Sequence, residues 1–218
     1  MSVWAVLAAA GSGERLGADR PKAFVRLGER PLLAESLERL EASPWIEAIV
    51  VAAPPEWEEP AILLAEELGA GKVNAVIAGG ATRAESVRAG VAEVGGDALV
   101  VLVHDAARPL VTEETVALVL APLGEGWDGA VPGLPLADTV KRVHGEAVVE
   151  TVARDDLVAV QTPQAFVAAV LRSASTGEAS DCAALVERAG GRVKVVPGDP
   201  RLLKVTDPSD LELVESWL

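Results

Sequence analysis

Short apolar segments alternate along this chain with amphipathic segments, and this alternation is the feature that most limits its fold. Apolar runs of strand length are followed by stretches whose apolar residues recur every three or four positions. The predicted strands are Val3–Ala10, Ala48–Ala53, Val73–Ala78, Ala98–Val103 and Val193–Val196. The predicted helices are Pro31–Ala42, Ile62–Leu68, Arg83–Val94, a helix capped by Thr112 that ends at Leu120, Gln164–Ser173, Asp181–Arg188 and Pro208–Leu218.

Strands that are apolar along their whole length predict a mostly parallel sheet covered by helices on both faces. Right-handed crossovers between such strands leave one main architecture, a three-layer, doubly wound α/β sandwich. The chain has 218 residues, of which 50% are hydrophobic, and this is enough for one large core. We therefore expect a single domain over residues 1–218.

Residues 137–154 do not fit this pattern. Polar and apolar residues alternate there, and His144 and Gly145 lie near the middle, which is typical of a β-hairpin. We predict an arm that projects from the sheet. Such an arm cannot bury both of its faces alone, so a partner subunit is expected to cover it. The alternative is an edge hairpin that lies on its own domain.

A glycine-rich segment follows the first predicted strand and suggests a dinucleotide site, a nucleoside triphosphate site or a turn without a ligand. Its glycines, Gly11, Gly13 and Gly17, miss the G-x-G-x-x-G spacing of dinucleotide-binding loops by one residue. No Gly-Lys-Ser/Thr follows, which excludes a P-loop. Arg15 and Lys22 accompany the glycines, and two cations beside backbone amides suit a phosphoryl group that gains negative charge. The triphosphate interpretation is favoured.

Two further polar clusters follow predicted strands, at the sheet edge where ligands of open α/β folds bind. Residues 79–86 follow the third strand and residues 104–109 follow the fourth, and small residues in both leave room for a ligand. Asp105 is placed to meet a hydroxyl group or a hydrated metal ion, or else it is a cap or turn residue. His104 is expected to be structural, because charge neutralisation requires no base that titrates near neutral pH.

Charge and cysteine content narrow the range of partners. The net charge of −14 opposes binding to polyanions such as nucleic acids and anionic membranes. A small anionic substrate remains possible at a local cluster of cations. The chain has one cysteine, no signal-peptide pattern, and no apolar run of the roughly 18 residues that a membrane span requires. We expect a cytoplasmic protein that binds neither nucleic acid nor membrane.

Seven motifs lie between Ala8 and Thr206, namely AAAGSGERL, RPKAF, GGATRAESV, VHDAARP, ADTVK, TPQAF and KVT, in this order. Together they resemble the 2-C-methyl-D-erythritol 4-phosphate cytidylyltransferases. The resemblance implies a Rossmann-like nucleotidyltransferase fold and a homodimer joined through the arm. It also implies the transfer of CMP from CTP to 2-C-methyl-D-erythritol 4-phosphate with Mg²⁺ or another divalent cation. The products would be 4-diphosphocytidyl-2-C-methyl-D-erythritol, an isoprenoid precursor of the non-mevalonate route, and pyrophosphate.

The resemblance also implies roles for individual residues. Arg15 and Lys22 match the catalytic positions, and Asp105 matches the metal position. The matched nucleotide-binding positions are Ala8, Ala9, Ala10, Gly11, Ser12, Gly13, Gly80, Ala81, Ser86, Asp105 and Ala106. The matched acceptor-binding positions are Arg108, Thr139, Arg154, Thr162 and Lys204, of which Thr139 and Arg154 would serve the neighbouring subunit's site.

Other functions stay open at this point. The VHDAARP motif is shared with cytidylyltransferases for ribitol 5-phosphate, and a sugar 1-phosphate is another conceivable acceptor. An NAD(P)-dependent oxidoreductase is disfavoured by the glycine spacing and by the Arg15/Lys22 pair. A non-catalytic nucleotide-binding subunit is disfavoured because Arg15, Lys22 and Asp105 are all present.

Overall fold

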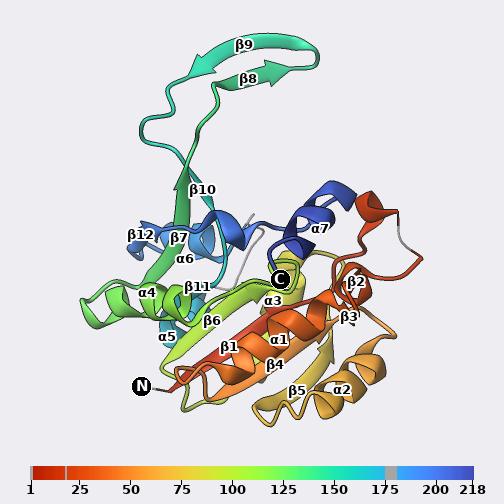
Figure 1. Cartoon of the computed structure of the whole chain (residues 1–218). Coiled ribbons are helices and arrows are strands. Elements are labelled where there is room, and N and C mark those ends of the chain that lie inside the picture. The colour runs from red at the N-terminus through yellow and green to blue at the C-terminus, as the bar shows by residue number, and fades with distance from the viewer. Residues whose placement is uncertain (1, 18, 175–180) are drawn as a thin grey trace.

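A central sheet lies between two layers of helices, and a two-stranded hairpin stands clear of this body in the computed structural model (Figure 1). The structure describes residues 2–17, 19–174 and 181–218. Residue 18 of the glycine-rich segment lies outside the described residues, as do Met1 and residues 175–180. The predicted α/β fold class, with its projecting hairpin, is confirmed.

The main sheet has eight strands, in the order β10-β7-β11-β6-β1-β4-β5, with β12 paired to β7. Neighbours among β6, β1, β4 and β5 are parallel, whereas β11 is antiparallel to both β6 and β7. The strands of this sheet are β1 Val3–Ala8, β4 Ala48–Ala53, β5 Val73–Ala78, β6 Val100–Asp105, β7 Gly129–Pro135, β10 Val158–Val160, β11 Gln164–Val167 and β12 Val193–Pro197.

The helices divide between the two faces of this sheet because successive strand residues point to opposite sides. Ala5 and Leu7 of β1 pack in the core with α1, α2 and α4, whereas Val6 packs in the core with α3, α5 and α6. The helices on the first face are α1 Leu32–Ala42, α2 Glu58–Glu67 and α4 Glu113–Gly124. The helices on the second face are α3 Arg83–Glu93, α5 Ala168–Ala174 and α6 Cys182–Arg188.

A third, smaller core holds the last segment of the chain against the segment after the glycine-rich loop. It joins Leu27, Leu32 and Leu110 to Val205 and to Val214 of α7. The minor elements here are η1 Glu14–Leu16, η2 Lys22–Phe24, β2 Arg26–Leu27, β3 Arg30–Pro31, η3 Pro200–Leu202 and α7 Pro208–Glu215. This packing brings residues near 22 and near 204 together, although the sequence separates them widely.

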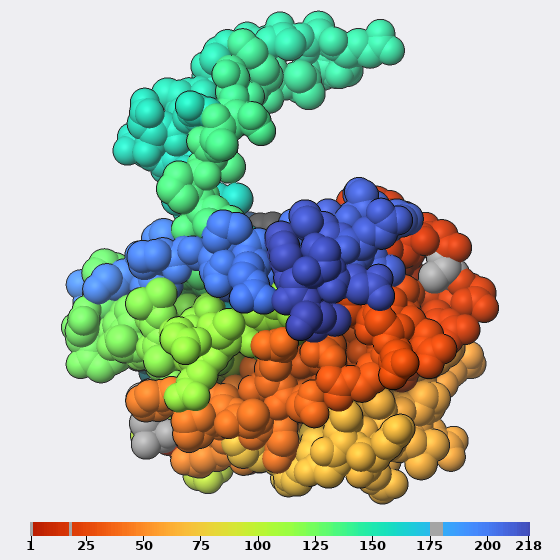
Figure 2. All heavy atoms as spheres, in the orientation of Figure 1, coloured from red at the N-terminus to blue at the C-terminus, as the bar shows by residue number. Residues whose placement is uncertain are grey.

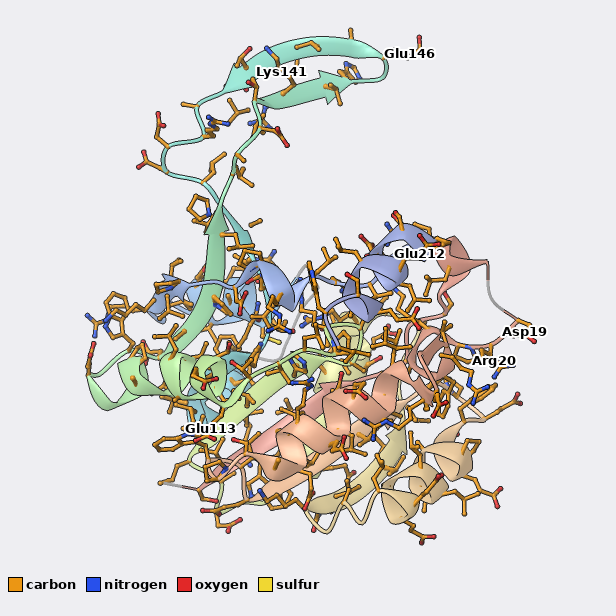
Figure 3. The ribbon with its side chains drawn as sticks, in the orientation of Figure 1. Asp19, Arg20, Glu113, Lys141, Glu146 and Glu212 are labelled. Atoms are coloured by element: carbon orange, nitrogen blue, oxygen red, sulfur yellow. The ribbon has the colours of Figure 1, made fainter. Side chains whose placement is uncertain are left out.

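The hairpin consists of β8 Val140–His144 and β9 Ala147–Val152. Figure 2 shows it rising from one end of the body and curving over open space. Its labelled residues Lys141 and Glu146 lie far from the body in Figure 3. The valines Val143, Val148 and Val149 are all more than half exposed. The arm therefore projects, and does not lie on its own sheet.

Several predicted boundaries are wrong. The first strand ends at Ala8, not Ala10, and the strand predicted to end at Val103 continues to Asp105. The predicted helix 164–173 begins instead as strand β11, because Ala165 and Phe166 face opposite cores in alternation. Strand β7 was not predicted, since its sequence GAVPGLP contains two glycines and two prolines. Among the described residues, none of the helices is both long and apolar enough for a membrane span.

Candidate active site

A cavity of about 570 Å³ opens at the carboxyl ends of β1, β5 and β6. Parallel strands bring these ends to one edge of the sheet, where open α/β folds bind ligands. Ala8 and Asp105 are direct neighbours in the β1–β6 register, so the glycine-rich loop and the carboxylate begin side by side. The lining residues are Ala8–Ser12, Lys22, Ala23, Pro55, Gly79–Arg83, Ser86, Asp105, Ala106, Ala107 and Lys204.

The glycine-rich loop folds back on itself at Lys22. The Lys22 amide donates to the Gly11 carbonyl, at 3.2 Å, and Gly13 adopts a left-handed conformation with φ of 77°. A Cβ at Gly13 would lie only 3.0 Å from the Cβ of Lys22, so glycine is required by both conformation and space. Among the described residues, no protein acceptor faces the amides of Gly11 and Ser12. These two amides can therefore bind an anion.

Lys22 is held at the entrance to this loop by a distant part of the chain. Its Nζ donates to the Val205 carbonyl at 3.1 Å. Burial, together with the nearby positive charges of Lys204 and Arg15, lowers the pKa of Lys22. Arg15 itself is exposed on η1 and does not line the cavity. The loop thus gathers cations that repel one another until an anion binds between them.

Hydrogen bonds fix the loop after β5. The Gly80 amide donates to Ser86 Oγ at 3.1 Å, and Ser86 Oγ donates to the Thr82 carbonyl at 2.9 Å. Thr82 caps α3 through a capping box with Glu85. At Gly79 an added Cβ would lie 2.3 Å from the Ala10 Cβ, so the two loops meet too closely for a side chain. These contacts give the cavity a rigid wall of backbone groups.

Asp105 is buried and forms two ion pairs. Arg83 Nε lies 2.7 Å from Oδ1, and Lys204 Nζ lies 2.7 Å from Oδ2. Burial alone would raise the pKa of Asp105, but the charges of Arg83 and Lys204 hold it well below its usual range. The cavity therefore contains a carboxylate that is ionised at neutral pH, with one cation on each oxygen.

A chain of buried hydrogen bonds supports the Asp105 backbone. The Asp105 amide donates to Thr162 Oγ1 at 3.1 Å, and this hydroxyl lies 3.1 Å from His104 Nδ1. His104 Nε2 lies 3.0 Å from the Arg108 carbonyl, which can only accept. Hence Nε2 carries the proton, Nδ1 accepts from Thr162, and the ring is neutral. Burial lowers the pKa of His104 to about 4, which agrees with the expected structural role.

The cavity can accept a divalent cation only with help from a ligand. Asp105 is the single acidic side chain among the described lining residues, and no group of three His, Cys, Asp or Glu residues lies together in the described parts of the chain. Mg²⁺ is commonly held by one or two carboxylates together with substrate phosphates. The residues present fit that arrangement, with Asp105 as the protein ligand.

The structure brings together most of the residues that the sequence predicted. Those that line the cavity are Ala8, Ala9, Ala10, Gly11, Ser12, Lys22, Gly80, Ala81, Ser86, Asp105, Ala106 and Lys204. Gly13 and Arg15 lie just outside, on the same loop. Thr139 and Arg154 are exposed on the arm side, where Arg154 donates to the Ala137 carbonyl.

Arg108 and Thr162 are not among the described residues that line the cavity. Arg108 Nη1 donates to the Leu202 carbonyl at 2.6 Å, and burial lowers the pKa of Arg108. Thr162 is buried, with its hydroxyl engaged as described above. Sequence reasoning missed Arg83, which lines the cavity and pairs with Asp105. Its position at the start of a helix, directly after the Gly79–Thr82 loop, was the available signal.

A cradle of backbone amides, a cationic cluster and an ionised carboxylate at one edge of a doubly wound sheet are the parts that a nucleotidyltransferase requires. The comparisons with known proteins agree with this class. Residues 3–218 match the family model IspD, 2-C-methyl-D-erythritol 4-phosphate cytidylyltransferase. The chain therefore belongs to the family of 2-C-methyl-D-erythritol 4-phosphate cytidylyltransferases.

Individual relatives support the same assignment. The enzyme of this name from Frankia casuarinae is 48% identical over 99% of this chain and 81% of its own length. The one from Nocardia farcinica is 44% identical over 100% of this chain and 94% of its own length. The crystal structure of the Thermus thermophilus enzyme is 36% identical, with a TM-score of 0.78 over 100% of this chain and 98% of that one.

Proposed function

We propose that this chain transfers CMP from CTP to 2-C-methyl-D-erythritol 4-phosphate, releasing pyrophosphate and 4-diphosphocytidyl-2-C-methyl-D-erythritol. The observation that carries the proposal is that Lys22, Asp105 and Lys204 line one cavity together with the amides of Gly11 and Ser12, which have no acceptor among the described parts of the chain. The family membership favours this acceptor over ribitol 5-phosphate. The reaction belongs to the supply of isoprenoid precursors, and we place it in the cytoplasm.

CTP would enter with its triphosphate on the Ala8–Gly13 backbone and its base toward the loop after β5. Gly80, Ala81 and Ser86 stand at that end, and Ala106 lies beside Asp105. Ala81 has no polar side chain, so backbone groups and Ser86 must recognise the cytosine.

The chemistry joins two anions. A phosphate oxygen of the acceptor attacks the α-phosphorus of CTP, and a new phosphorus–oxygen bond forms. The bond to the bridging oxygen breaks, and its electron pair leaves with pyrophosphate. The attacking oxygen is already ionised, so no base is required. The protein's task is to position the reactants and neutralise their charge, which we assign to Lys22 and Arg15.

A divalent cation fits beside Asp105, as described above. It would be held by Asp105 and by phosphate oxygens of CTP, and it would supply further neutralisation of the triphosphate. Lys22 and Arg15 then act on the α-phosphate from the loop side. The divalent cation would thus neutralise charge on the triphosphate, while Lys22 and Arg15 neutralise charge on the α-phosphate.

The acceptor would lie between Lys204 and the arm of a second subunit. The arm projects away from its own cavity, and its three exposed valines are suited to contact with another protein surface. Thr139 and Arg154 would then reach the partner's site, where Arg154 pairs with the acceptor phosphate. Arg108 and Thr162 would support this site from behind, through their contacts with the Leu202 and Asp105 backbones.

Pyrophosphate release tests the function. Purified protein with Mg²⁺ and CTP is given 2-C-methyl-D-erythritol 4-phosphate, ribitol 5-phosphate or a sugar 1-phosphate in separate reactions. We expect release with the first acceptor alone. Release with another acceptor would keep the nucleotide chemistry and overturn the acceptor. CTP binding without release from any acceptor would indicate a binding subunit, and a thermal shift with NAD would indicate an oxidoreductase.

A further inference from the structure

Arg83 extends from the first turn of α3 into the wall between two cavities. It lines the nucleotide cavity, and on its other side it lines a small cleft with Asp181 and Cys182 of the α6 N-terminal region. One quarter of its side chain is exposed. Its Nε donates a hydrogen bond to Asp105 Oδ1 at 2.7 Å. Arg83 therefore stands between the carboxylate of Asp105 and the residues of the small cleft.

Lys204 holds the other oxygen of Asp105 in a different way. It extends from an irregular segment between η3 and α7, and its side chain is 39% exposed. Its ammonium is a single point of attachment on a flexible stem, whereas the guanidinium of Arg83 is planar and presents several donors. Of the two cations on Asp105, Lys204 is the one that can move.

The proposed function gives these two cations different tasks. If Lys204 binds the acceptor phosphate, its ammonium must leave Asp105 Oδ2 or share its charge with the phosphate. The same oxygen is the one that a divalent cation would approach, because Arg83 occupies Oδ1. A buried carboxylate that loses every counter-charge is strongly destabilised. Some group must therefore remain on Asp105 while Lys204 moves.

We propose that Arg83 is a positioning residue that keeps Asp105 paired and oriented, and so releases Lys204 to bind the acceptor phosphate. This inference rests on the proposed function for the role of the acceptor. The ion pair between Arg83 and Asp105 does not depend on the proposed function, because it is a property of the folded protein without substrates. Arg83 acts through Asp105 and Lys204, and it need not touch either substrate.

The first test is a double-mutant cycle on stability. The free energy of unfolding in urea is measured for the wild type, Arg83→Met, Lys204→Met and the double variant, without substrates. We expect Lys204→Met to destabilise the protein more when Arg83 is absent than when it is present, because Lys204 is then the last counter-ion of Asp105. Equal costs in the two backgrounds would overturn the proposal, whatever the enzyme's acceptor is.

The second test separates binding from turnover. In Arg83→Met, Lys204 is held on Asp105, so we expect the KM for 2-C-methyl-D-erythritol 4-phosphate to rise at least about tenfold. The Kd for CTP from calorimetry should change by less than about threefold. Arg83→Lys should bring the KM for the acceptor back close to the wild-type value, because the positive charge and one hydrogen-bond donor remain. Equal losses for both substrates would indicate a merely structural role and overturn the proposal.

Arg88→Met provides a matched control. Arg88 is exposed on the same helix and also borders the small cleft, so the change removes the same charge from the same element. We expect its KM values to stay near those of the wild type. A similar rise of the acceptor KM in Arg88→Met would show a general effect of charge and contradict the role of Arg83. If the wild type rejects the acceptor, the proposed function fails, while the stability cycle still decides the pairing.

Discussion

Lys22 Nζ donates a hydrogen bond to the carbonyl oxygen of Val205, 183 residues further along the chain. This bond joins the glycine-rich loop to the segment that carries Lys204. The small core of Leu27, Leu32 and Val205 keeps the two segments in contact beneath it. The two ammonium groups thus reach one cavity from opposite ends of the sequence. Burial, together with the repulsion from Lys204, lowers the pKa of Lys22, and this repulsion favours an anion between the two ammonium groups.

Lys22→Ala should reduce turnover by orders of magnitude, while the affinity for CTP stays within about tenfold of the wild type. The reason is that Lys22 acts most strongly on charge that develops at the α-phosphate in the transition state. Initial rates of pyrophosphate release and calorimetry with CTP measure the two quantities. Lys72→Ala is a matched control, because Lys72 also donates to a backbone carbonyl, that of Ser43, away from the cavity. Near-normal turnover in Lys22→Ala would refute the catalytic assignment.

Arg154→Ala and Lys22→Ala should complement each other. In a mixed dimer, one site combines the intact Lys22 of one chain with the intact Arg154 of the other. Mixing two inactive proteins in equal amounts under subunit exchange should therefore restore roughly a quarter of the wild-type rate, since half of the dimers are mixed and each has one complete site. Pyrophosphate release is followed over time after mixing.

The arm itself supplies the control for this experiment. Arg142 forms an exposed ion pair with Glu150 on the hairpin. Arg142→Ala should therefore keep most of the wild-type activity by itself, without being mixed with a second variant. A lack of recovery in the Arg154→Ala and Lys22→Ala mixture, with exchange shown by differently tagged chains, would exclude crossed arms.

The pH dependence of stability should include a contribution from His104. Its ring is fully buried, and burial lowers its pKa to about 4, against 6.5 for the unfolded state. Between these values the unfolded chain binds a proton that the folded protein does not, so stability falls as the pH falls from 6.5 to 4. The full loss is about 3 kcal/mol, and above pH 6.5 this contribution does not change.

Urea denaturation of the wild type and of His104→Gln from pH 7 to pH 4.5 measures this contribution. Glutamine offers a donor and an acceptor to Thr162 and Arg108 but does not titrate in this range. We expect the variant to be less stable at pH 7 and to approach the wild type as the pH falls. A constant difference between the two proteins would show that His104 does not contribute to the slope.

Gly79→Ala should weaken both the fold and CTP binding. The new methyl group would meet Ala10 Cβ at 2.3 Å and Ser86 Oγ at 2.9 Å, and both residues line the cavity. We expect a loss of about 1–3 kcal/mol of stability, as for other overpacked sites, and a CTP Kd raised at least about tenfold. Gly96→Ala is the control, because no atom lies within 4 Å of a Cβ added there. Equal behaviour of the two variants in thermal unfolding and calorimetry would contradict this account.

The first half of the sheet could be predicted from the sequence because its strands are mostly apolar. Ala48–Ala53 was predicted to the residue. The second half could not, since β7 contains residues that usually break strands. Its Gly129 is needed because a side chain there would lie 2.5 Å from Phe166 of β11. That requirement comes from packing between strands remote in sequence, and local patterns do not contain it.

The same limit applies to the site. The loops at the ends of β1, β5 and β6 were predicted because each follows a recognisable strand. Arg83 was missed, because an arginine at the start of a helix usually lies in solvent, and only the tertiary structure places Asp105 against it. The motif around Thr162 predicts a contact with the acceptor, and this stays a prediction. The contacts of its hydroxyl with the Asp105 amide and His104 could not be predicted, because they join segments that are remote in sequence.

The projecting arm has a consequence for how the enzyme would behave in a cell. If each cavity is completed by a neighbour's Arg154, an isolated chain does not keep half of the dimer's activity and is almost inactive. Specific activity would then depend on the concentration of the protein itself, falling on dilution as the dimer dissociates. Flux through such a step would rise more steeply than in proportion to the amount of enzyme made, until nearly every chain has found its partner.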